Sequence, residues 1–231
     1  MKMIDNVNEK LIDDLSLEIK KGSKLSMAAA YFSIYAYEAL KKELSNIGEL
    51  RFIFTDPTFI QNENSKKEKR EFFIPKLRRE RGIYGTEFEV KLRNELNQKA
   101  IAKECAAWIR KKVTFKSNVG NKNIPKFMLV DDTSYMNING FTTVDLGCEK
   151  GNDSFVSIIK LESPMSQQLV DNFNALWNNE DELKNVTEKV INSISSAYNE
   201  NSPEFVYFVT LYNIFHEFLQ DISEDELPNE R

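Results

Sequence analysis

The chain of 231 residues has one histidine, His216, and this limits the catalytic chemistry open to it. Hydrolytic zinc sites usually rest on two or three imidazoles, and a Ser-His-Asp or Cys-His triad would have to use His216 itself. That residue lies in a hydrophobic run, residues 212–219, with helical spacing and no nucleophile motif near it. We interpret His216 as a helical residue, and every site that needs two imidazoles is excluded.

A lysine and an aspartate stand five positions apart in the octet Ile124-Pro125-Lys126-Phe127-Met128-Leu129-Val130-Asp131. The apolar run between them predicts a strand. A second group, the carboxylates of Asp131, Asp132, Asp145 and Glu149, lies around the octet in sequence and could hold a divalent cation. Carboxylates on adjacent strands are more often solvated or ion-paired, so the metal site is the lesser alternative.

The charge is strongly segregated. Residues 1–61 have 8 basic and 9 acidic side chains, residues 62–126 have 18 and 8, and residues 127–231 have 5 and 19. The middle segment is therefore at +10 within a chain of net charge −5. A block of this kind is typical of a phosphate-facing surface, of a solvated face or of a docking surface for an acidic partner.

Periodicity and turn signals predict the elements that position these residues. Helices are expected at residues 8–21, 34–45, 86–112, 167–177, 180–197 and 203–219, and strands at 24–32, 49–55, 113–115, 126–130 and 141–146. Helix, strand, helix and strand with short connections favour an α/β fold with a mixed, largely parallel sheet flanked by helices. We expect one domain over residues 1–178 and a helical extension and linker over 179–231.

Composition excludes several classes. Hydrophobic residues make up 41% and charged residues 29% of the chain, too balanced for a fibrous or disordered protein. No apolar run approaches the roughly 20 residues that span a bilayer, so no membrane partner is expected. Cys105 and Cys148 fit no paired motif, which favours a reducing, cytoplasmic location.

The octet, with Gly140-Phe141-Thr142-Thr143 nine residues later and a helix ending Phe173-Asn174-Ala175-Leu176-Trp177, resembles the phospholipase D-like family. The motif of that family is His-x-Lys-(x)4-Asp, followed by a Gly/Ser/Asn-rich strand. The resemblance implies a phosphate-binding role for Lys126 and a site shared across a homodimer. The nucleophilic histidine of the family is replaced by Ile124, which cannot form a phospho-enzyme, so catalysis is not expected.

Four further segments resemble the N-terminal region of bacterial Snf-type helicases of superfamily 2 (DEAD/DEAH-related), where a degenerate phospholipase D-like domain precedes an ATP-driven motor. They are AAAYFSIYA (28–36), LRFIFT (50–55), YGTEF (84–88) and GFTTVDLG (140–147). The tail from 201 to 229 resembles the segment that leads into the motor, so the chain is expected to stop within a linker. It has no Gly-x-x-x-x-Gly-Lys-Ser/Thr motif, so ATP and Mg²⁺ belong by resemblance to the parent protein and no cofactor is expected here.

Three hypotheses follow. The first is an inactive accessory module that binds DNA backbone or regulates the helicase motor of its parent chain, through Lys76, Arg78, Arg79, Arg81, Lys99, Lys103, Lys111 and Lys126. For Lys126, pairing with Asp131 is an equal alternative. The second is a nuclease with a non-standard site at the four carboxylates. The third is a dimerisation or docking module, with the aromatic helix of residues 205–218 as a candidate surface.

Overall fold

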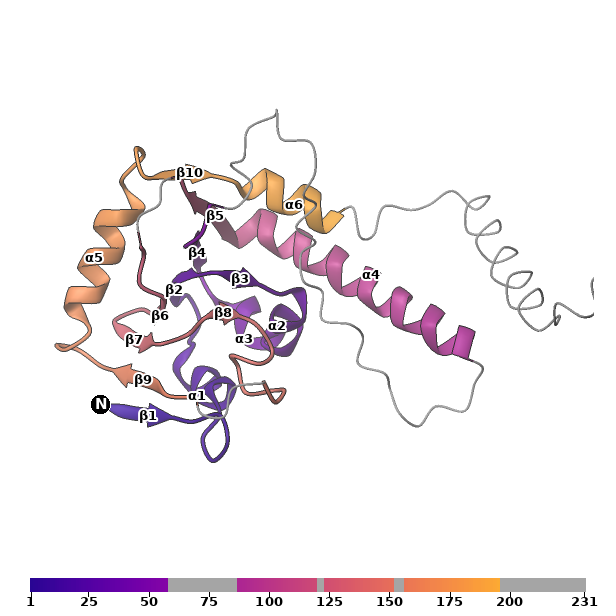
Figure 1. Ribbon diagram of the computed structural model, residues 1–231, viewed down its shortest axis with the longest axis horizontal. Coiled ribbons are helices and arrows are strands. Elements are labelled where there is room, and N and C mark those ends of the chain that lie inside the picture. The colour runs from indigo at the N-terminus through magenta and orange to yellow at the C-terminus, as the bar shows by residue number, and fades with distance from the viewer. Residues whose placement is uncertain (58–86, 120–122, 152–155, 196–231) are drawn as a thin grey trace, which may run out of the picture. The chain divides into compact units, whose positions relative to one another are not determined.

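A computed structural model describes residues 1–57, 87–119, 123–151 and 156–195, without the side chains of 87–97 (Figure 1). All of these belong to one compact unit, Met1–Tyr198; a second unit, Asn199–Arg231, lies outside the described residues. Among the described helices, none has the length and apolar character to cross a membrane.

An eight-stranded mixed sheet forms the centre of the unit, with the strand order β1-β9-β7-β6-β2-β4-β5-β10. A separate pair, β3 and β8, is parallel. The strands are β1 Lys2–Ile4, β2 Lys24–Ala29, β3 Tyr31–Phe32, β4 Glu49–Phe54, β5 Val113–Asn118, β6 Phe127–Val130, β7 Thr133–Met136, β8 Gly140–Phe141, β9 Ile158–Leu161 and β10 Leu183–Asn185.

The prediction of a largely parallel sheet is wrong. Within the described residues, five neighbouring pairs of the large sheet are antiparallel, and only β2–β4 and β4–β5 are parallel. Parallel pairing needs a crossover connection, which the helical segments between these three strands supply. The connection from β6 to β7 has two residues, Asp131 and Asp132, so the chain must return antiparallel.

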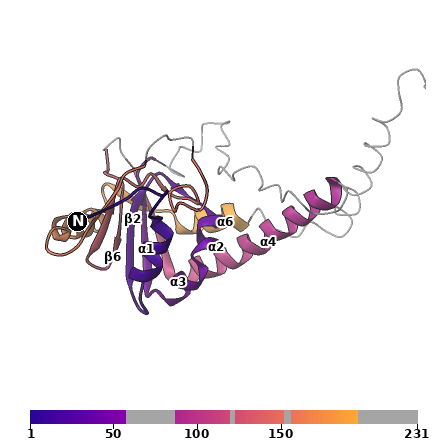
Figure 2. The same cartoon turned by 90° about the horizontal axis from the view of Figure 1, so that it is seen from below.

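The helices lie on the two faces of the sheet. They are α1 Leu11–Glu18, α2 Ile34–Ala39, α3 Lys41–Asn46, α4 Glu87–Lys112, α5 Gln167–Trp177 and α6 Thr187–Ser195. Figure 2 shows α1, α2, α3, α4 and α6 to one side of β2 and β6, and Figure 1 shows α5 across the sheet from α4 and α6. We call the first side the helical face and the second the α5 face.

Each face buries its own apolar cluster. On the helical face, Phe52, Phe115 and Ile109 are fully buried together with residues of α1, α2, α3 and α6. On the α5 face a smaller cluster joins the sheet to Phe173 of α5 and includes Ala28, Ile53, Ile124, Phe127, Leu129 and Leu183. Strands buried on both faces lose their hydrophobic alternation, which is why β2 ends in the apolar run Met27–Ala29 and β4 in the apolar run Phe52–Phe54.

Four predicted elements differ from the structure by more than a few end residues. The strand expected at 24–32 is divided at Ala30 into β2 of the large sheet and β3 of the small one. The helix expected at 34–45 is divided at Leu40 into α2 and α3, although no Gly or Pro marks the break. The strand expected at 141–146 ends at Phe141, because the following residues form turns in which Asp145 accepts hydrogen bonds from Thr142 Oγ1 and Asn139 N. The helix expected at 180–197 begins only at Thr187, since residues 183–185 pair with β5 as strand β10.

A buried ionic network fastens α1 to the sheet edge. Lys160 of β9 donates to Asp14 Oδ2 at 2.8 Å and to Glu18 Oε2 at 2.9 Å, and Tyr135 donates to the same Asp14 oxygen at 2.7 Å. Burial raises the pKa of Asp14, but the hydrogen bonds from Lys160, Tyr135 and Lys2 outweigh burial and hold that pKa below its ordinary value. Burial lowers the pKa of Lys160, and its bonds to the two carboxylates more than reverse this.

We expect Lys160→Met to destabilise the fold by about 3 kcal/mol at pH 7, because it leaves buried carboxylates without their main cation. The stabilisation from Asp14 is complete above its unfolded pKa, near 3.8, and is lost as the pH falls through its lower folded pKa. Urea unfolding at pH 7 and at acid pH should therefore show the gap between wild type and variant narrowing in acid. Lys184→Met, at an exposed site on β10, is the control, and equal stability of the Lys160 variant and wild type at pH 7 would refute the network's role.

Candidate functional site

Ile124 stands where the phospholipase D-like motif has its histidine, and the structure buries it. Its side chain is 6% exposed and packs in the cluster of the α5 face with Phe127 and Phe173. Isoleucine here closes the apolar contact between the start of β6 and α5. The position therefore stabilises packing and presents no reactive group.

Lys126 and Asp131 do not come together. Lys126 is exposed just before β6, and Asp131 follows the last residue of the same strand. Five residue steps along an extended strand separate their Cα atoms by about 17 Å. The ion pair weighed for them from sequence is therefore excluded by the extended backbone.

Asp131 instead supports the turn between β6 and β7. Its φ of +51° lies in the left-handed region, which aspartate tolerates better than most residues. Its Oδ1 accepts a hydrogen bond from Lys24 N at 2.8 Å, and its own N–H donates to Lys24 O at 2.9 Å. These bonds attach the hairpin to the first residue of β2.

The carboxylates weighed for a metal site are also apart. Asp131 and Asp132 lie at the β6–β7 turn, whereas Asp145 bonds Thr142 and Asn139 N, and Glu149 accepts from Thr143 Oγ1. Within the described residues, no group of three His, Cys, Asp or Glu side chains is placed to hold a metal ion. The non-standard nuclease site built on these carboxylates is not formed.

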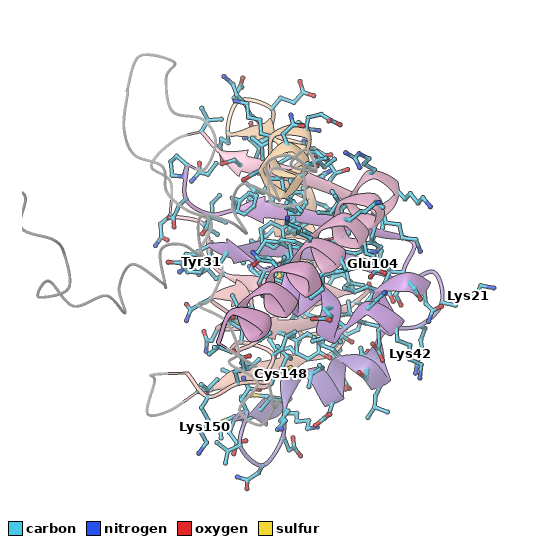
Figure 3. The ribbon with its side chains drawn as sticks, turned by 90° about the vertical axis from the view of Figure 1, so that its right-hand side faces the viewer. Lys21, Tyr31, Lys42, Glu104, Cys148 and Lys150 are labelled. Carbon is cyan, nitrogen blue, oxygen red and sulfur yellow. The ribbon has the colours of Figure 1, made fainter. Side chains whose placement is uncertain are left out.

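The carboxyl ends of the parallel strands β2, β4 and β5 meet at one edge of the sheet, which we call the carboxyl edge. Asn118 Nδ2 there donates to Thr55 O at 2.9 Å. The buried hydroxyl of Thr55 has no hydrogen-bond partner among the described residues. Tyr31 is 60% exposed at this edge, and Figure 3 shows it there. Ligands of α/β sheets commonly bind at such an edge, but no described cavity or charged cluster marks it as a site.

Two cations on the α5 face were not singled out by sequence reasoning. Arg51 of β4 donates to Ser26 Oγ and to Asn174 Oδ1, and its guanidinium lies 4.9 Å from the centre of the Phe173 ring. Burial lowers the pKa of Arg51. Lys116 donates to Trp177 O at 2.7 Å, at the C-terminal end of α5 where a cation is favourable. Both cations hold α5 on the sheet, which explains them structurally.

Three predicted nucleic-acid contacts lie on α4. Lys103 and Lys111 are exposed and Lys99 is half-buried, and none forms an ion pair with a described residue. Lys99 and Lys103 share one side of the helix with Arg110. Lys111 follows Glu104 by two turns and lies toward α3, because Glu104 pairs with Lys41 of that helix.

The structure thus divides the predicted contacts. Lys111 is at the end of α4 that enters β5, and Lys126 is at the opposite end of the parallel strands. Lys76, Arg78, Arg79 and Arg81 lie outside the described residues, as do His216 and the aromatic segment 205–218.

Comparisons with known proteins give distant structural likenesses alone. No family model matches the chain, and no curated protein matches it. A crystal structure of phosphatidylserine synthase from Haemophilus influenzae Rd KW20, a phospholipase D-like fold, is similar with a TM-score of 0.44 and 16% identity. The match covers 80% of this chain and 38% of that one, so the chain spans less than half of its length. A likeness this slight carries no argument here.

A histidine at position 124, as in the motif that the octet resembles, should damage the fold without creating a nucleophile. We expect Ile124→His to cost about 2–4 kcal/mol, because it places a polar ring in an apolar cluster and removes packed carbon. Thermal unfolding measures the cost, and Ile124→Val is the conservative control, expected near 1 kcal/mol. A histidine variant as stable as the wild type would show that position 124 is not packed as described.

The turn role of Asp131 predicts which substitutions it tolerates. Asp131→Asn should change stability by less than about 0.5 kcal/mol, since asparagine also accepts the Lys24 N–H and tolerates positive φ. Asp131→Ala should cost about 1–2 kcal/mol, because both features are lost. Equal losses for the two variants in denaturant unfolding would indicate that the charge, and not the turn, matters at this position.

Proposed function

We propose that this chain is a catalytically inactive accessory domain of the phospholipase D-like kind, which binds the backbone of DNA for an ATP-driven motor in the same parent protein. The observation that carries the proposal is the set of exposed cations on α4. Lys103, Arg110 and Lys111 are exposed, and none has an acidic partner among the described residues. Such cations attract phosphates independently of base sequence.

Inactivity is supported by one feature of the motif. Ile124, which stands at the position of the motif's histidine, is buried in an apolar cluster. The motor, its ATP and Mg²⁺, a cytoplasmic location and a homodimer remain expectations from the sequence resemblance.

Titration against fluorescent single- and double-stranded DNA at several salt concentrations, with magnesium present, tests both DNA binding and catalytic inactivity. If about six phosphates are engaged, the logarithm of affinity should fall against the logarithm of salt with a slope of about −5. Gels of the same mixtures should show uncut DNA, because Ile124 stands at the position of the motif's nucleophilic histidine. A slope near zero would contradict DNA binding.

Magnesium-dependent cleavage would contradict inactivity. Asp131→Asn separates the cases, because its turn role is retained while its carboxylate is lost. Loss of cleavage in this variant would revive the nuclease hypothesis, and unchanged cleavage would indicate a contaminating nuclease.

A further inference from the structure

Five lysines from three separate segments gather at the amino edge of the sheet, where β2, β4 and β5 begin. Lys20 and Lys21 follow α1, Lys42 lies on α3, and Lys111 and Lys112 end α4. We call these five the amino-edge lysines. In Figure 3, Lys21 and Lys42 project together at this edge, and Tyr31 lies on the opposite side of the same view.

Hydrogen bonds fix the three segments against one another. Trp108 Nε1 donates to Leu44 O at 3.1 Å, so the last turns of α4 lie along α3. Lys112 Nζ donates to Ser45 O and to Ile47 O, each at 2.7 Å. The loop after α1 joins them, because Gly22 N donates to Asn46 O at 2.8 Å. The lysines therefore sit on one rigid support.

The acidic residues near this surface are mostly paired elsewhere, so its net charge is positive. Glu104 is paired with Lys41, and Glu49 with Lys24. Asp14 and Glu18 of α1 point inward to Lys160. Among the described residues, Glu43 on α3 and Asp131, whose Oδ1 accepts from Lys24 N, are acidic side chains near this surface outside these pairs, and Asp132 follows Asp131 at the β6–β7 turn.

Stabilisation of the helix ends does not explain why all five amino-edge lysines are present. A cation at the end of α4 is favoured by the helix dipole, which explains Lys112 and contributes at Lys111. Lys42 is the second residue of α3, where the same dipole disfavours a cation. Lys21, Lys42 and Lys111 are exposed, and no described residue forms an ion pair with them.

We propose that the amino-edge lysines are the surface on which the phosphate backbone of duplex DNA docks. This inference rests on the proposed function and assigns its location to the end of the sheet opposite Ile124 and Lys126. Ammonium groups spread over a rigid surface suit a line of phosphates, and among the described residues no exposed aromatic side chain lies between them to stack a base. Binding should therefore be salt-sensitive and indifferent to sequence.

Two triple variants of the full chain test the location at equal net charge. The first is Lys21→Gln, Lys42→Gln and Lys111→Gln; it leaves Lys20 and Lys112, whose ammonium groups bond backbone carbonyls. The second, the control, is Lys10→Gln, Lys150→Gln and Lys184→Gln, at exposed positions elsewhere. Fluorescent duplex DNA is the probe, and thermal unfolding confirms that both variants fold.

The first variant should bind about tenfold or more weakly at 0.1 M salt, and its salt slope should move from about −5 to about −2 as three phosphate contacts are lost. The control should match the wild type. If wild type binds DNA and the first variant binds equally well, or if both variants weaken alike, the location is wrong while the proposed function stands.

If the wild type does not bind DNA at low salt, the proposed function and the location both fail. The last measurement is the binding of wild type and the first variant to vesicles containing phosphatidylserine. Vesicle binding that the first variant loses, with DNA binding unchanged, would overturn the inference in favour of a membrane surface.

Discussion

Five phenylalanine rings hold the parallel strands to the elements beyond their carboxyl ends. Phe32 of β3 contacts Phe52, Phe115 and Phe141, and Phe54 contacts Phe52 and Phe115, with ring centroids 4.9–5.8 Å apart. Edge-to-face and offset contacts of this kind restrict orientation as well as burying area. The small β3–β8 sheet, which contains the Gly140 segment, is thereby fixed to β4 and β5. Helices α1, α3 and α4 of the helical face pack on this core. The packing therefore fixes the positions of the amino-edge lysines, which lie on these helices or directly after them.

The sequence predicts a helix or strand best where one side of the element is apolar and the other is polar, because the hydrophobic periodicity is then clear. The expected helix at 167–177 coincides with α5, whose apolar stripe has a polar opposite side. In α4, alanines occur on both sides of the helix, so the pattern does not show which side is buried: Ala100 and Ala107 are exposed, while Ala102, Ala106 and Ile109 are buried. Strands β1, β7, β9 and β10 were not predicted, because three or four residues give little periodicity. Lys160 shows the difficulty, since its burial depends on carboxylates more than 140 residues away.

Positions along the chain gave a wrong expectation for the pairing of Lys126 with Asp131, and they did not reveal the amino-edge lysines as one surface. A lysine and an aspartate five residues apart would be neighbours on a turn, but an intervening strand holds them at its two ends. Residues 1–61 have a net charge of −1, so this segment as a whole does not look basic. The structure turns Asp14 and Glu18 inward and leaves Lys21 and Lys42 outside. Only the folded arrangement separates those charges.

The chain has two tryptophans, and the sheet lies between them. Trp108 is nearly buried on the helical face, where its indole N–H bonds Leu44 O. Trp177 is half-buried on the α5 face, with Lys116 Nζ 4.8 Å and the Arg51 guanidinium 5.6 Å from its ring centre. The two indoles therefore differ in polarity and in nearby charge, and their emission spectra should differ accordingly. With one tryptophan replaced by phenylalanine, the intrinsic fluorescence of the other becomes an optical reporter for a single side of the molecule.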